Sequence, residues 1–313
     1  MATKVRIGRS RPAGEAGDEA AGAVERLATL LEAGVAPESA WAYLGEFSSH
    51  PVIAAIAAGG ARGERPAEAL DRSVAGRGAV NDAWRSLAAA WIVADACGTP
   101  LAPTLRELAT ALRAGAETER DVDVALTGPV ATSRLVTWLP AVGLALGMLM
   151  GVDVVAALFG SLLGAGALAA GVVLMLCGRA WTRSMVARAT PRRASPGLRL
   201  DLTAVALSGG VSVSRATAIV DESLARFGLR GGASAELGRI LALADRAGAP
   251  AVDLLRSAAR QERREARTSG QRAAAALAVR LMLPLGICVL PAFMLLGVAP
   301  VVLSIVSSTV GSL

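Results

Sequence analysis

The chain has 313 residues, of which 53% are hydrophobic, 19% charged and only 3% aromatic, and its formal net charge at pH 7 is +6. This composition is too apolar for an ordinary soluble domain and too charged for a protein made only of membrane spans. The basic excess consists of arginines, with Lys4 as the only lysine. Such a bias is typical of high-GC coding and gives little support to a nucleic-acid partner.

The chain begins with residues 1–20, which lack the apolar core of a signal peptide and are expected to form a flexible, basic, cytoplasmic leader. Residues 21–134 then read as a first cytoplasmic helical module, because apolar residues such as Val24, Leu27 and Leu31 repeat at helical spacing. Gly34 is expected to end one helix in the left-handed conformation. In "ACGTPLAPTL", a helix is expected to stop at Gly98 and another to start at Pro100.

Residues 135–178 carry a single charge, Asp153, and are long enough for a transmembrane hairpin of two helices with the turn near Asp153. That carboxylate is expected at the interface, with a buried ion or proton site as the alternative. Glycines recur every fourth residue on both predicted helices, which would let backbones approach closely. They pack the hairpin on itself or form a docking face for another protein, and the candidates are Gly143, Gly147, Gly151, Gly160 and Gly164.

The next segment, 179–199, reads as a basic juxtamembrane linker, and residues 200–280 as a second cytoplasmic helical module. A third charge-free run, 281–309, contains Pro284, Pro291 and Pro300 and is predicted to be a kinked transmembrane helix, followed by a tail, 310–313. Arginines lie at one end of each of the three predicted crossings, next to a module. By the positive-inside rule, both modules are therefore expected in the cytoplasm. The predicted fold class is an all-α membrane protein with about three transmembrane helices.

The two modules resemble each other in sequence. "LLEAGVAPESAWAYL", with Gly34, is echoed by "ALSGGVSVSRATAIV", with Gly210. At an offset of 150 residues, Gly98 and Pro100 correspond to Gly248 and Pro250. This pattern predicts an internal repeat of helices and glycine turns that leads twice into the membrane. The glycines are expected to be helix stops, and a hinge or partner-contact role is the alternative.

The duplicated module with its "aG-V...A" and "A-x-x-x-G-x-P...L" turns, each copy feeding an apolar run with an early Leu-Pro, resembles the type II secretion F-type proteins. These are inner-membrane platform proteins of type II secretion and type IV pilus machines. The short second module and three apolar runs are most similar to the subgroup of tight-adherence (Flp) pili, the TadB and TadC proteins.

This resemblance implies a non-enzymatic platform in the cell (inner) membrane. Its implied partners are a cytoplasmic secretion or pilus assembly ATPase, a sister platform protein, pilin subunits, further copies of itself as a homo-oligomer and membrane lipids, with no nucleic acid. The platform would couple the ATPase to insertion of pilin into the fibre. A small membrane transporter or channel subunit is the alternative function, although three crossings are few for it.

The long helices that enter the membrane are expected to carry opposite charges. Acidic residues dominate at the end of the first module and arginines at the end of the second, and they form solvated ion pairs, meet each other or contact anionic lipid. The candidates are Glu117, Glu119, Asp121, Arg263, Arg264 and Arg267.

No enzyme site is expected. The sequence has no G-x-x-x-x-G-K-[ST] motif, and with Lys4 as the only lysine a phosphate-binding loop is excluded from the folded part. The single histidine, His50, stands before Pro51, where a helix-start role is favoured over a catalytic base. The three cysteines lie far apart, so we expect no metal, cofactor or disulfide framework.

Overall fold

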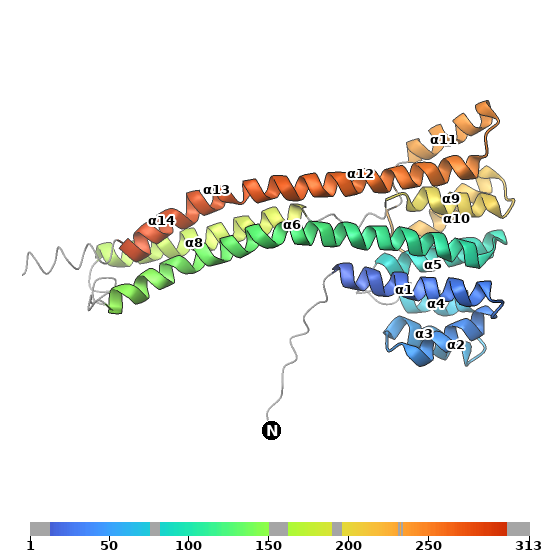
Figure 1. Cartoon of the computed structure of the whole chain (residues 1–313), viewed down its shortest axis with the longest axis horizontal. Coiled ribbons are helices and arrows are strands. Elements are labelled where there is room, and N and C mark those ends of the chain that lie inside the picture. The colour runs from blue at the N-terminus through green and yellow to red at the C-terminus, as the bar shows by residue number, and fades with distance from the viewer. Residues whose placement is uncertain are drawn as a thin grey trace, which may run out of the picture. The chain divides into compact units, whose positions relative to one another are not determined.

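The computed structural model describes residues 13–75, 82–149, 162–189, 196–230, 232 and 234–298 (Figure 1). Helices and turns account for these residues, and no strand occurs among them, so the all-α prediction is confirmed for this part of the chain. Contacts divide the chain into two compact units. Unit 1 is Met1–Arg120 with Arg192–Thr268, and unit 2 is Asp121–Pro191 with Ser269–Leu313.

Unit 1 begins with five helices and the first part of a sixth. They are α1 (Ala13–Glu32), α2 (Pro37–Phe47), α3 (Pro51–Gly60), α4 (Pro66–Ala75), α5 (Asp82–Cys97) and α6 (Leu101–Leu149), of which residues to Arg120 belong to unit 1. Three of the helices start with proline, whose fixed φ suits the first turn and whose missing N–H has no partner there in any case. His50 caps α3, its Nδ1 accepting a hydrogen bond from the Val52 N–H at 3.2 Å, as expected for a helix-start residue.

The second module contributes α9 (Leu198–Ser208), α10 (Val213–Arg226), α11 (Ser234–Ala247) and the first part of α12 (Ala251–Arg280). Among the described residues, two helices, α10 and α11, lie between Gly210 and Gly248, whereas four helices, α2 to α5, lie between Gly34 and Gly98 of the first module. The two modules do not form separate cores. Buried side chains of α9 and α10, including Leu202 and Val220, belong to the same hydrophobic cluster as Leu27, Trp84 and Leu87.

Helix α5 lies at the centre of this common core, in contact with α1, α4, α9 and α10. Its sequence explains the position, because "AWRSLAAAWIVA" is apolar on nearly all sides and contains many alanines, which let neighbouring helices approach. A smaller cluster, which includes Leu200, Ile240 and Leu255, joins α9, α11 and α12.

Unit 2 contains the rest of α6, α8 (Leu162–Ala189), the end of α12 and a chain of short helices. These are α13 (Met282–Pro284), η1 (Leu285–Val289), α14 (Leu290–Phe293) and η2 (Met294–Val298), all of which contact α8. Helix α8 continues through the first part of the predicted basic linker, since "RAWTRSMVARA" contains no glycine or proline to end it.

The prolines of the last apolar run disturb the helix as predicted. Both η segments are π-helical, one directly after Pro284 and the other three residues after Pro291. Proline removes the N–H that a carbonyl four residues earlier would accept, and the next N–H, five residues on, can take its place in a π-helical pattern. The irregular stretch is therefore a consequence of the proline spacing.

Two helical stretches of the described chain are long and apolar enough to cross a membrane, Gly164–Met185 and Ala251–Leu296. They overlap the second predicted crossing, within 135–178, and the third, 281–309, but Gly164–Met185 extends past Gly178 into the predicted linker and Ala251–Leu296 begins well before Leu281. The first predicted crossing begins in α6, whose described part ends at Leu149, and it is not among these candidates. The leader to residue 12, the hairpin turn with Asp153, and residues 299–313 lie outside the described residues, as do Gly151 and Gly160.

Candidate functional site

The four glycine turns singled out by the repeat have the same backbone conformation. Gly34, Gly98, Gly210 and Gly248 have φ values of 85°, 67°, 82° and 62°, the left-handed region that favours glycine at the end of a helix. They follow α1, α5, α9 and α11, respectively. The expectation that they stop helices is met.

The turns at Gly98 and Gly248 also contain equivalent hydrogen bonds. The Thr99 N–H donates to the Ala94 carbonyl at 2.9 Å, and the Ala249 N–H donates to the Ala244 carbonyl at 3.1 Å. These two bonds have the same span and lie 150 residues apart, at the offset of the sequence repeat. Each closes the helix end with a six-residue turn of the Schellman type.

Two of the turns of the first module meet in space. Gly34, Gly98 and Pro100 line one open groove of about 580 Å³, together with neighbouring residues such as Asp95 and Leu101. Sequence spacing alone gave no reason to place these turns together. They meet because α1, α5 and α6 pack against one core, and α1 and α5 end where α6 begins.

The turn at the end of α9 packs against the turn at the end of α5. The Thr99 hydroxyl donates to the Val205 carbonyl at 2.8 Å, and both residues are buried. A methyl group on Gly209 would overlap the Cys97 carbonyl oxygen, so only glycine fits at that contact. Sequence reasoning had named Gly210 and missed Gly209, although a second glycine beyond the one needed for the turn was a signal of close approach.

Gly210 itself is not part of this contact. A side chain added at Gly210 would meet nothing within 4 Å, and the same holds at Gly248. Pro250 precedes α12, as Pro100 precedes α6. In these positions the glycines set the direction of the chain and leave space around them.

The long helices α6 and α12 carry the predicted charged residues. In unit 1, Arg267 Nη1 lies 3.3 Å from Glu117 Oε2, and in unit 2 the Gln271 side-chain amide donates to Asp121 at 3.1 Å. The acidic and basic candidates therefore meet in part. Arg263 has a different partner, Asp201 of α9, at 2.5 Å. Glu119, on the same stretch of α6, is engaged in an interaction of its own.

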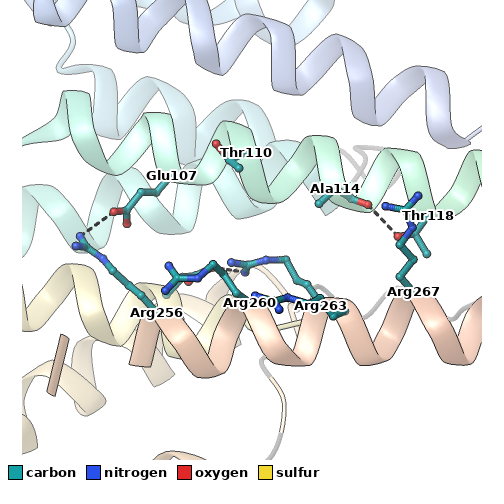
Figure 2. Close-up of a pocket in the computed structure, with 10 residues that line it drawn as sticks. Glu107, Thr110, Ala114, Thr118, Arg256, Arg260, Arg263 and Arg267 are labelled. Carbon is teal, nitrogen blue, oxygen red and sulfur yellow. Dashed lines mark hydrogen bonds and ion pairs between the residues drawn. The ribbon is translucent and has the colours of Figure 1, made fainter. Parts of the chain in front are cut away.

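Arg263 and Arg264 lie in a pocket of about 320 Å³ within unit 1 that is rich in arginine (Figure 2). We call it the arginine pocket. It is lined by Glu107, Thr110, Ala114, Thr118, Asp201, Arg256, Arg260, Arg263, Arg264 and Arg267. The arginines all come from α12, on successive turns of one side of that helix, while Glu107 and the small side chains come from α6.

Two carboxylates neutralise part of this charge. Arg256 lies 3.0 Å from Glu107, and Arg263 is paired with Asp201. Burial raises the pKa of the Asp201 carboxyl above its ordinary value, and the adjacent Arg263 guanidinium acts in the opposite direction. Asp201 is therefore a carboxyl group in a poorly hydrated environment, directly beside an arginine side chain.

The predicted glycine faces are seen only in part. Gly143 and Gly147 lie in α6, and Gly164 is buried in α8. Gly171, one heptad after Gly164, lies very close to another element of unit 2, since an added Cβ would lie 2.5 Å from Leu296 Cγ of η2. The seven-residue spacing from Gly164 was a usable signal that sequence reasoning passed over.

No group of three potential metal-ligating side chains occurs among the described residues. Cys97 and Cys288 are buried and Cys177 is exposed. Cys177 lies on α8 and Cys288 on η1, and these two elements pack against each other in unit 2. The arrangement offers helix packing, a groove between turns and a cationic pocket.

Comparison with known families gives one match. Residues 23–149 match the model of the family described as Type II secretion system (T2SS), protein F. The matched segment runs from α1 through α6, and the second module lies outside it. No curated protein and no solved structure matches the chain. Members of this family are inner-membrane proteins, and the chain is similar to them over this segment, which is less than half of its length.

Proposed function

We propose that this protein is an inner-membrane platform of a type II secretion or type IV pilus machine, of the tight-adherence (Flp) subgroup. In this role it holds a cytoplasmic assembly ATPase through unit 1 and helps pass pilin subunits from the membrane into the fibre. The observation that carries the proposal is the family match over residues 23–149.

The correspondence between the two modules gives the proposal its second support. The 150-residue offset pairs Leu105 with Leu255 and Ala109 with Ala259, and all four side chains are buried in unit 1. Together with the equal helix-end hydrogen bonds, this favours α9–α12 as a shortened second copy of the matched module. Two copies of such a module, each leading into an apolar helix, are the layout that the resemblance implies.

The platform is proposed to work without chemistry of its own. The absence of a phosphate-binding loop motif means that ATP-driven movement must come from a partner. Helices α6 and α12 each supply residues to both units, so each is a continuous element through which a displacement in unit 1 can be passed on.

Co-elution tests the proposal directly. The full-length chain, tagged and extracted in mild detergent after crosslinking in cells, is expected to elute with the assembly ATPase and the pilin of the same machine. An unrelated multi-pass membrane protein, expressed and extracted in the same way, is the control. Recovery of neither partner above that control would overturn the platform role.

Orientation is tested separately with a thiol probe. Phe47 of α2 is 89% exposed, so a Phe47→Cys variant in a background without other cysteines offers one accessible thiol on unit 1. A membrane-impermeant maleimide should label it in inside-out vesicles and not in intact cells. Labelling in intact cells would contradict a cytoplasmic unit 1.

A further inference from the structure

Two arginines of the arginine pocket have no carboxylate partner among the residues that the structure describes. Arg260 and Arg264 line it, and neither has an ion pair or a side-chain hydrogen bond with another described residue. Their neighbours Arg256, Arg263 and Arg267 each have a carboxylate partner. The pocket therefore carries a net positive charge that the described residues do not neutralise.

The two carboxylates of α12 that are nearest in sequence to Arg260 and Arg264 have other partners. Glu262 accepts a hydrogen bond from the Gly197 N–H at 2.7 Å, and Glu265 accepts one from the Gln261 side-chain amide at 2.8 Å. Arg256, Arg260 and Arg264 follow one another at four-residue spacing, where like charges on a helix repel. A bound anion would remove that repulsion.

The opposite wall of the pocket leaves room for such an anion. Thr110, Ala114 and Thr118 of α6 are short, and Figure 2 shows them across from the arginine side chains of α12. Both hydroxyls already donate to carbonyls of their own helix, Thr110 to Arg106 at 3.0 Å and Thr118 to Ala114 at 2.9 Å. Hydrogen-bond donors for a ligand must therefore come from the guanidinium groups.

We propose that the arginine pocket is a binding site for a phosphate group, held by Arg260 and Arg264. A guanidinium presents a planar fork of N–H donors that matches the oxygens of phosphate, and two forks on successive helical turns can hold one phosphate or two linked ones. Both arginines are solvent-exposed, so a ligand can reach them, and the volume of about 320 Å³ is sufficient for a diphosphate. The phosphate belongs to a lipid headgroup or to a free soluble anion.

Thermal unfolding of the full-length protein in neutral detergent tests the site. Pyrophosphate, or anionic phosphatidylglycerol in the micelles, should raise the Tm by about 2–4 °C when present at roughly five times its Kd, the shift expected for a unit of this size. Sodium chloride at matched ionic strength and zwitterionic phosphatidylcholine are the reference conditions. A shift with pyrophosphate alone identifies a soluble ligand, and a shift with phosphatidylglycerol alone identifies a headgroup.

The deciding variant is R260Q/R264Q, which should lose the shift. Its control is R239Q/R246Q, which removes the same charge from α11, where Arg239 pairs with Glu236, and which should keep the shift. Because R260Q/R264Q removes repulsion and no ion pair, the variant should fold and have a Tm without ligand at least equal to that of the wild type.

No shift of the wild type with either ligand, or an equal shift in both variants, would overturn the phosphate site. The measurement involves neither the ATPase nor pilin, so its result is independent of the proposed platform role.

Discussion

Units 1 and 2 differ in how far their large apolar side chains are buried. In unit 1 the large apolar residues, among them Leu27, Trp84 and Leu87, are buried against one another in a core to which both modules contribute. In unit 2 many of them face outward. Val173 and Leu176 of α8 are 64% and 62% exposed, and Ile287 of η1 is 57% exposed.

The two units therefore differ in what stabilises their folds. Unit 1 removes apolar surface from water by its own packing, as the helices of a bundle with a hydrophobic core do. Unit 2 leaves an apolar surface that its own helices do not cover, as expected for helices whose outer faces meet lipid. Close backbone approach at glycine then matters more there than a large core.

Truncating the centre of the unit 1 core should have the largest effect. Trp84 is 1% exposed and stacks on His50 with ring centroids 4.5 Å apart. Trp84→Ala should lower the free energy of unfolding by about 3–5 kcal/mol. Chemical denaturation followed by circular dichroism measures this. The control, Phe47→Ala at an exposed position, should change it by less than about 0.5 kcal/mol.

Adding a methyl group to the turn contact should have the next largest effect. Gly209→Ala forces the α9 turn away from the Cys97 carbonyl and should cost about 1–3 kcal/mol, whereas Gly210→Ala meets no neighbour and carries only the left-handed penalty of about 1–2 kcal/mol. The same denaturation assay compares them. An equal or larger loss in Gly210→Ala would mean that the contact between the two turns is not tight.

Disulfide formation between two cysteines of unit 2 can report on how its helices pack. In a Cys97→Ala background, Cys177 and Cys288 should form a disulfide on mild oxidation of membranes, because α8 and η1, which carry them, pack against each other. Gly171→Leu should reduce the yield severalfold by pushing η2 from α8, and Gly166→Leu, where nothing lies within 4 Å, should leave it unchanged. The yield is measured by gel mobility without reductant. A matching loss in both variants would refute the close contact at Gly171.

The ion pair between the long helices should have the smallest effect. Glu117 and Arg267 are both about half exposed, so their interaction is worth about 0.2–1 kcal/mol. Glu117→Arg and Arg267→Glu should each lower stability slightly, and the double exchange should restore it. Thermal melts at low salt measure this coupling, and additive losses in the double variant would show that the pair contributes nothing.

Local features of the fold were predictable from sequence, and contacts between distant segments were not. The glycine stops at Gly34 and Gly98 and the disturbance after Pro284 follow from backbone chemistry within a few residues. The common core of the two modules depends on how α5 packs with α9 and α10, and a sequence pattern does not encode which helices will be neighbours.

The candidate sites divide in the same way. The charges on α6 and α12 were visible as a pattern, yet the pairing of Arg263 with Asp201 required the structure. Helix α9 is buried on most of its sides, so its apolar pattern singles out no face, and only packing against α12 shows that Asp201 lies beside Arg263.

The pairs Glu117–Arg267 and Asp121–Gln271 both join positions 150 residues apart, the offset of the repeat proposed for the two modules. In a dimer of identical chains, a residue on the two-fold axis meets its own equivalent, so an acid there would face the same acid. A single chain that contains two related halves is free of this restriction. Under the proposed duplication, each half carries its own residue at the meeting point, and here one side is acidic while the other is basic or an amide. Joining two copies into one polypeptide would thus permit an asymmetry that symmetry forbids.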